Sequence, residues 1–170
     1  WGKVLATYVD DEGRTDFRKL ANSPNDLKAF VEALKDHGPI TSPQDFDTPE
    51  KVLAYHINAY NALAMYGVVE EGIPSGFNSF FKRAAFFKFR KVWVNGEKTN
   101  LYDYENDVIR PLGEARAHFA LNCMVRDCPR LPQKPFIAET LDADLEALSV
   151  EFFSKDLHFR ADKSKSTVFD

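Results

Sequence analysis

The residues best suited to chemistry lie in one stretch, "HFALNCMVRDCPRLP", residues 118–132. It contains both cysteines of the chain, Cys123 and Cys128, and His118 five residues before the first of them. A cysteine becomes a strong nucleophile when a nearby imidazolium lowers its pKa. Two cysteines separated by four residues can instead form a disulfide if the loop turns. The stretch therefore allows a thiol enzyme, a cross-linked loop or part of a metal site.

The first interpretation is a thiol nucleophile, either Cys123 or Cys128, that uses His118 as its general base. Residues 117–122, "AHFALN", predict a short buried strand in which His118 faces away from Cys123. At about 3.3 Å per residue, the two are also too far apart along a strand to touch. A contact between His118 and a cysteine therefore requires the following loop to fold back. Glu105 is the carboxylate that we predict orients His118 as the base.

The second interpretation is a structural disulfide between Cys123 and Cys128, which would hold Arg126 at the tip of a rigid loop. Closing a ring of this size stabilises a fold by about 2 kcal/mol.

The third interpretation is a metal site formed by the two cysteines with His118 and His56. Zinc sites permit this spacing, but the chain has neither a second cysteine pair nor a His-Glu-x-x-His element. We therefore expect no metal and no cofactor.

The sequence "TPEKVLAYHINAYNALAMYGVVEEGIP" predicts the longest helix of the chain. Thr48 is suited to cap this helix, Pro49 to begin it and Gly72 to end it. No charged side chain occurs in residues 52–69. The run is at the short limit for a membrane span and has polar residues in its middle, so we expect no transmembrane segment. The prediction is a central helix that is buried on nearly all sides.

Asn58 and Asn61 lie three residues apart on this helix and therefore share a face. A buried amide without partners costs about 1–3 kcal/mol, so each must bind something specific. Either they tie loops to the core, or they point into a site and position a substrate. In the second case Arg110 or Arg126 would anchor an anionic group of that substrate.

The remaining segments predict further helices and two hairpins. Helical patterns occur near residues 1–8, 23–38, 101–110 and 139–156, and hairpin patterns occur at 92–99 and 157–169. Asn95-Gly96 is a dipeptide that type I′ turns favour. These elements predict a mainly helical α+β fold, one domain over residues 1–170, with the buried central helix packed against a small antiparallel sheet.

The composition is that of a folded globular domain, with 44% hydrophobic and 28% charged residues among 170. Its net charge of −4 argues against a nucleic-acid partner, and we expect a small-molecule or peptide substrate.

One segment is basic although the chain as a whole is acidic. In "FFKRAAFFKFRK", residues 80–91, cations are mixed with aromatic side chains. Such a mixture fits single-stranded nucleic acid or an anionic membrane surface. The alternative is a partly buried connector whose lysines and arginines reach solvent.

Three motifs resemble those of the domain of unknown function 547 family of bacteria and plants. They are "AYHINAYNAL", "LYDYENDVIRPL" and "HFALNCMVRDCPRLP", and they occur in the family's order at similar separations. Glu105, Arg110, His118 and both cysteines match positions of these motifs. His56 stands where the family usually has Trp, and Asn106 stands where it usually has His.

The resemblance covers residues 10–156 and implies export to the periplasm or cell envelope, where bacterial members often occur, although no signal peptide is visible. It also implies an element beyond Asp170, because family members are expected to continue after the last hairpin. The family has no established activity.

A cysteine, a histidine and an amide are the residue types that papain-like hydrolases use. Our main hypothesis is a cysteine-dependent hydrolase or acyl transferase. The alternative is a non-catalytic binding module with a structural disulfide.

Overall fold

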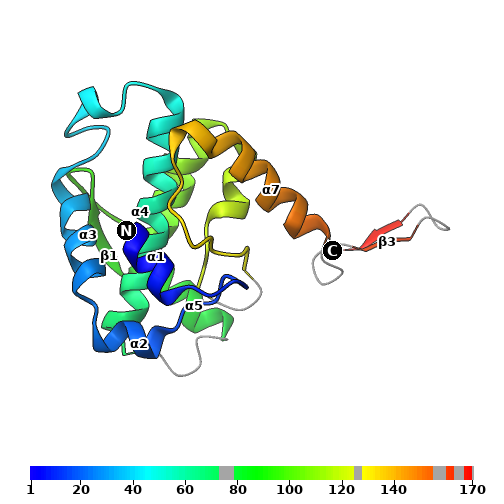
Figure 1. The fold of residues 1–170 in the computed structure, drawn as a ribbon, viewed down its shortest axis with the longest axis horizontal. Helices are drawn as coiled ribbons and strands as arrows, with labels where there is room; N and C mark the ends of the chain where they lie inside the picture. Colours follow the sequence, from blue (N-terminus) through cyan, green and yellow to red (C-terminus); the bar gives the residue numbers. More distant parts are fainter. Residues whose placement is uncertain (73–78, 125–127, 155–159, 163–166, 170) are drawn as a thin grey trace.

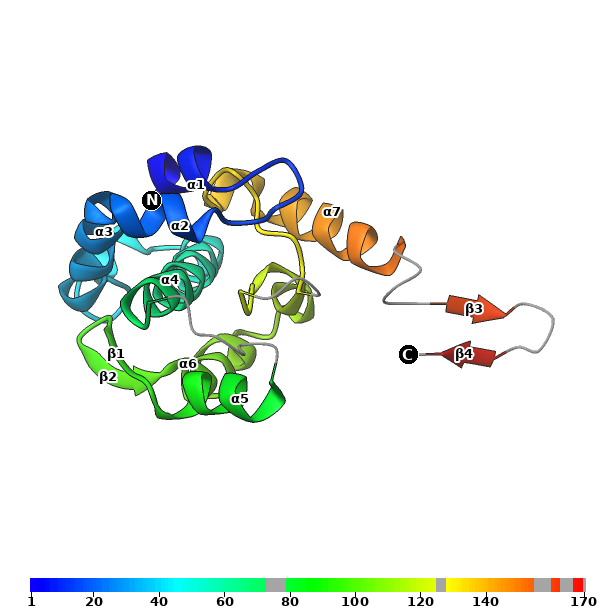
Figure 2. The same ribbon diagram turned by 90° about the horizontal axis from the view of Figure 1, so that it is seen from below.

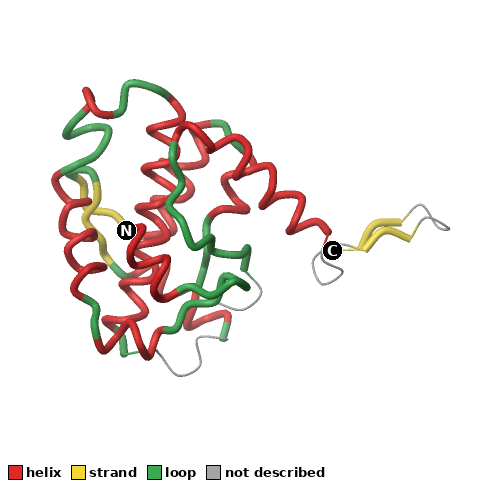
Figure 3. Tube along the Cα trace, viewed as in Figure 1, coloured by secondary structure: helices red, strands yellow, loops and turns green. Residues whose placement is uncertain are grey.

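The computed structural model describes the chain except residues 73–78, 125–127, 155–159, 163–166 and 170. Helices pack around one another in a rounded body, with one hairpin at its side and a second hairpin beyond its last helix (Figures 1 and 3). This arrangement confirms the predicted mainly helical α+β domain with a small antiparallel sheet.

The α-helices are α1 Gly2–Tyr8, α2 Phe17–Asn22, α3 Asn25–Asp36, α4 Pro49–Glu70, α5 Phe80–Phe89, α6 Leu101–Asp103 and α7 Leu141–Ser154. Short 3₁₀ segments are η1 Pro43–Asp45, η3 Arg110–Leu112, η4 Ala115–Ala120 and η5 Ala138–Thr140, and η2 Tyr104–Ile109 is a π-helical turn. The strands are β1 Lys91–Val94, β2 Glu97–Asn100, β3 Arg160–Asp162 and β4 Thr167–Phe169.

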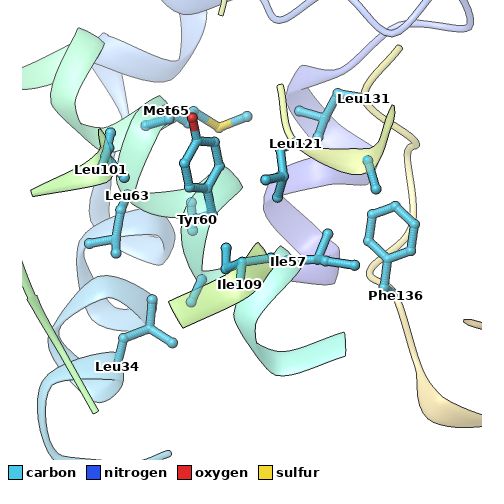
Figure 4. Close-up of a cluster of buried hydrophobic side chains, with 14 of the residues drawn as sticks. Leu34, Ile57, Tyr60, Leu63, Met65, Leu101, Ile109, Leu121, Leu131 and Phe136 are labelled. Atoms are coloured by element: carbon cyan, nitrogen blue, oxygen red, sulfur yellow. The ribbon is translucent and has the colours of Figure 1, made fainter. Parts of the chain in front are cut away.

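Helix α4 runs through the middle of the body, with other helices around it (Figure 2). The side chain of Thr48 accepts a 3.2 Å hydrogen bond from the backbone N–H of Lys51, which caps the helix as predicted. Ile57, Ala62 and Met65 are fully buried, and Figure 4 shows this part of the core. Burial of the charge-free run is therefore confirmed. None of the described helices is long and apolar enough to cross a membrane.

Strands β1 and β2 form the predicted hairpin, in which Val94 pairs with Glu97. Asn95 and Gly96 between them have positive φ angles of 56° and 80°, as a type I′ turn requires. Val92 and Val94 are buried on one face of the strand, which packs against α3. The Asn95 side chain also accepts a 2.7 Å hydrogen bond from the backbone of Ile40, so the turn is tied to the loop after α3.

Residues 101–110 do not form the single α-helix that was predicted. One α-helical turn, α6, passes directly into the π-helical turn η2 and then into η3. Pro111 has no N–H to donate and its ring crowds the preceding turn, so the chain cannot continue as an α-helix there. The helical pitch changes twice in this segment, at Tyr104 beside Glu105 and again at Arg110 before the proline.

The strand predicted for residues 117–122 is also wrong, because most of this segment is the 3₁₀ helix η4. Its exit is held by the side chain of Asn61, which takes the backbone hydrogen bonds of Ala120 and Asn122. A neighbouring strand would otherwise have to supply those partners. An amide from α4 thus replaces the sheet neighbour that a strand would need.

The C-terminal part of the chain begins with α7, whose buried Leu145 packs toward the body. α7 lies against η4, and Arg116 on η4 forms ion pairs with Asp142 and Glu146 on α7. Beyond α7, β3 pairs with β4 in the predicted closing hairpin, with Arg160 opposite Phe169. Both views show this hairpin apart from the helical body (Figures 1 and 2).

Candidate functional site

A pocket of about 450 Å³ opens between the η2–η3 segment and η4. Its lining includes Glu105, Ile109, Arg110, Ala117, His118 and Leu121. Three of the predicted site residues therefore meet here, namely Glu105, Arg110 and His118. They come from two motifs that the sequence separates by several residues, so the fold brings them to one solvent-reachable cleft.

Glu105 is the central residue of this pocket. Its Oε1 lies 3.4 Å from Nδ1 of His118 and 3.2 Å from Nη2 of Arg110. Its Oε2 accepts a hydrogen bond of 3.3 Å from the hydroxyl of Tyr60 on α4. The Glu105 side chain is only 17% exposed, whereas that of His118 is 60% exposed. The carboxylate thus forms the floor of the pocket and the imidazole stands at its mouth.

The electrostatics of the pocket favour an ionised Glu105. Burial alone would raise the pKa of this carboxyl group, but the hydrogen bonds and positive charges of His118 and Arg110 outweigh burial and lower it. Burial, followed by the charge of Glu105, raises the pKa of Tyr60 well above its ordinary value. At neutral pH, the Glu105 carboxylate therefore accepts hydrogen bonds from the protonated hydroxyl of Tyr60 and from the basic side chains beside it.

The π-helical turn explains why Glu105 and Arg110 stand together. The backbone N–H of Arg110 donates to the carbonyl of Glu105, five residues earlier, which is the bond that defines a π turn. Residues five apart point to different sides of an α-helix, but here they lie one above the other. This turn was not predicted from the sequence, and π turns occur frequently at functional sites.

Tyr60 was not among the predicted site residues. It belongs to the charge-free run of α4 and is buried, and a buried tyrosine hydroxyl usually needs a hydrogen-bond partner. That requirement is the signal that could have directed attention to Tyr60. It links the central helix to the floor of the pocket.

Asn61 does not line this pocket. Its Nδ2 donates to the carbonyl of Ala120 and its Oδ1 accepts from the backbone N–H of Asn122, both at 2.8 Å. The side chain is buried and bonded to backbone on both sides of Leu121. These contacts match the interpretation that the amide ties a loop to the core.

Asn58 makes the same kind of contact at another segment. It donates to the carbonyl of Phe136 at 2.8 Å and accepts from the N–H of the same residue at 3.0 Å. The indole N–H of Trp1 also donates to Asn58, at 3.0 Å. Asn58 therefore joins α4 to the start of the chain and to the segment before η5, away from Glu105.

Cys123 and Cys128 form a disulfide, with their Cα atoms 5.9 Å apart. In this state neither sulfur is a thiol, so a nucleophilic role would require reduction. The ends of the loop are also held by Asn122, which donates to the carbonyl of Pro129 and accepts from the N–H of Met124, both at 2.6 Å. Arg126, the predicted anchor for an anion, lies outside the described residues.

His56, which the metal interpretation grouped with the cysteines, lies in the core. Its Nδ1 is 2.6 Å from the hydroxyl of Tyr104, and the ring is almost fully buried. Burial lowers the pKa of His56 to about 4, so the imidazole is neutral at physiological pH. Within the described part of the chain, no group of three or more His, Cys, Asp or Glu residues is arranged to hold a metal ion.

A family model described as "Protein of unknown function, DUF547" matches residues 43–153. The chain belongs to the DUF547 family. The matched region contains the Glu105 pocket, both asparagines of α4 and both cysteines, so the family resemblance seen in the motifs is confirmed. No curated protein and no solved structure matched the chain. Membership in DUF547 does not assign an activity, which must be argued from the site.

Proposed function

We propose that this DUF547 domain is a hydrolase for small molecules that carry an anionic group, and that the Glu105 pocket is its active site. The observation that supports the proposal is that one partly buried carboxylate contacts both His118 and Arg110 at the wall of a pocket. A histidine held by a carboxylate is suited to general acid–base chemistry. An arginine beside it is suited to holding a carboxylate or phosphate.

In this proposal His118 removes a proton from a water molecule. Glu105 faces Nδ1, which leaves Nε2 as the ring nitrogen that exchanges the proton. The water attacks the carbonyl carbon of a bound ester, and the carboxylate of Glu105 stabilises the imidazolium that forms. The tetrahedral intermediate then collapses with cleavage of the ester C–O bond, and the imidazolium returns its proton to the leaving alkoxide. Contacts such as the 3.4 Å separation here often shorten when the substrate binds.

Arg110 supplies substrate selection in this proposal. Its side chain is largely exposed, and a guanidinium has five N–H donors, of which the contact to Glu105 uses one. The remaining donors can pair with an anionic group of the substrate. Such a group would sit beside the ester that His118 acts on.

A cysteine-dependent hydrolase or acyl transferase is a second proposal, for the reduced protein. Leu121 lines the pocket, and Cys123 follows two residues later, within about 7 Å of chain. Reduction would release a thiol in the segment that directly follows this wall of the pocket. A non-catalytic binding module would instead use the same pocket, rigidified by the disulfide and the asparagine contacts, without turnover.

The test compares two esters, 4-nitrophenyl hemisuccinate, which has a free carboxylate, and 4-nitrophenyl acetate, which does not. We expect the oxidised protein to accelerate hydrolysis of the hemisuccinate more than that of the acetate, each rate being divided by the spontaneous rate, because the carboxylate of the hemisuccinate also attacks its own ester. His118→Gln should lower the rate with both esters by about 100-fold. Arg110→Gln should remove the preference for the hemisuccinate, and His37→Gln, at an exposed histidine outside the pocket, should change neither.

The other outcomes separate the alternatives. Activity that appears only with a reductant and is lost after thiol alkylation would favour the cysteine mechanism. Calorimetric binding of succinate without hydrolysis of either ester would favour a binding module. Full activity of His118→Gln would contradict the role of the imidazole.

A further inference from the structure

Three large aromatic side chains stand exposed on adjacent elements. Phe89 at the end of α5 is 73% exposed, Trp93 on β1 is 48% exposed and Tyr102 on α6 is 50% exposed. Large aromatic side chains usually bury most of their surface, so several together outside the core indicate a surface that meets another phase or partner. We call these residues, with the lysines described below, the aromatic–basic surface.

The elements that carry these side chains are contiguous. α5 passes through one residue, Arg90, into β1, β1 pairs with β2, and α5 contacts both β2 and α6. Lys88 on α5 places its Nζ 5.4 Å from the centre of the Tyr102 ring on α6, which joins the two helices. Figure 2 shows α5, α6 and the β1–β2 hairpin together along one side of the body, on the same side of α4.

Exposed lysines surround the aromatic side chains. They are Lys82 and Lys88 on α5, Lys91 on β1 and Lys98 on β2. Lys98 lies opposite Trp93 in the hairpin, and Lys91 is exposed on the same face of the strand as Trp93. Only two acidic residues occur on these four elements, Glu97 and Asp103, and the side chain of Asn100 donates to Asp103. Four lysines against two carboxylates make this surface locally positive in a chain whose net charge is −4.

We propose that the aromatic–basic surface docks this domain on anionic phospholipid membranes. Trp and Tyr favour the boundary between headgroups and hydrocarbon, and lysines are attracted to anionic headgroups. Phe89 supplies apolar area that can enter the upper part of the acyl region. Single-stranded nucleic acid, the other partner that fits cations with aromatics, is held in grooves with successive bases stacked on the rings. Here the three rings protrude from three separate elements.

Docking on this surface is independent of the proposed hydrolysis, because none of its residues lines the Glu105 pocket. The residues that face the membrane would then be different from those that form the Glu105 pocket. A DUF547 domain of this kind would be a peripheral membrane protein that binds through side chains, without inserting a helix.

The test is sedimentation of the full chain with vesicles of phosphatidylcholine alone or with roughly 30% phosphatidylglycerol. We expect binding to the anionic vesicles at low salt, with a shift of the tryptophan emission to shorter wavelength that is lost in Phe89→Ala/Trp93→Ala, and release at about 0.5 M salt. Lys88→Glu/Lys91→Glu should weaken binding at least about tenfold, and so should Phe89→Ala/Trp93→Ala. The matched control is Ile40→Ala/Ile137→Ala, which removes two exposed apolar side chains elsewhere and should bind as the wild type does.

Three results would overturn the proposal. One is equal binding to neutral and anionic vesicles, or none to either. Another is binding of a thymidine oligonucleotide that the lysine variant loses, which would assign the surface to single strands. The third is a dimer in sedimentation velocity that Phe89→Ala/Trp93→Ala converts to a monomer, which would assign it to self-association. Thermal unfolding of the same variants, followed by circular dichroism, separates loss of docking from loss of the fold.

Discussion

The side chain of Asn61, in the middle of α4, accepts a 2.8 Å hydrogen bond from the backbone N–H of Asn122. The same amide donates to the carbonyl of Ala120, so it holds the backbone on both sides of Leu121. Leu121 lines the Glu105 pocket. A core asparagine that does not itself reach the pocket therefore fixes one of its walls.

Removing this amide should destabilise the fold strongly. Asn61→Leu keeps a similar volume but leaves a buried N–H and a buried carbonyl unpaired, and we expect the free energy of unfolding to fall by about 2–4 kcal/mol. Urea denaturation measures the change. Asn106→Leu is the matched control, because Asn106 is partly exposed and its amide donates to the carbonyl of Tyr102, where water can replace the lost partner. Equal small losses for both variants would contradict the bracing role.

His56 should make stability depend on pH. Its pKa is lowered from 6.5 to about 4 by burial, so between these values the unfolded chain binds more protons than the folded chain. The contribution is complete above pH 6.5 and is lost as the pH falls toward 4. We expect His56 to account for a loss of about 2 kcal/mol between pH 7 and pH 5.

Unfolding measured at these two pH values tests this expectation. His56→Phe should reduce the fall in stability, since no proton can then bind at this position. Leu63→Ala, a core truncation in the same helix, should lower the free energy of unfolding by a similar amount at both pH values. If His56→Phe kept the full pH dependence, the assignment to His56 would be wrong.

The disulfide should stabilise the domain modestly. Cys123→Ser/Cys128→Ser removes a short ring, and on the chain-entropy model the free energy of unfolding should fall by about 2 kcal/mol. The wild type should lose a comparable amount when a reductant is added, whereas the double variant should be insensitive to reductant. A wild type that is equally stable with and without reductant would argue against a stabilising cross-link.

The elements that were predicted correctly have local signals. Thr48 and Pro49 mark the start of α4, and Asn95-Gly96 marks the β1–β2 turn, because capping and turn geometry depend on a few neighbouring residues. Residues 117–122 were misread as a strand, since their apolar pattern does not reveal that Asn61, far away in sequence, supplies their backbone partners. Local pattern cannot identify such a partner.

The site was predicted only in part for a related reason. Glu105, Arg110 and His118 do meet, but the π-helical turn that aligns the first two has no sequence signal of its own. Asn58 and Asn61 were expected to be buried and bonded; both are bonded, but only Asn61 is fully buried, and Asn58 is partly buried. Which groups a buried amide bonds to, however, is decided by the packing of distant segments. For that reason the choice between a brace and a substrate contact stayed open until the fold was known.

The most direct test of the account is the tautomer of His118, measured by ¹H–¹⁵N correlation spectroscopy of its imidazole. If Glu105 orients the ring through Nδ1, the neutral form at about pH 8 carries its proton on Nδ1, and Nε2 is left as the base. Glu105→Ala should abolish this preference, while Glu114→Ala, which removes another carboxylate of the pocket lining, should retain it. A wild-type spectrum with the proton on Nε2 would contradict the claim that Glu105 prepares His118 for catalysis.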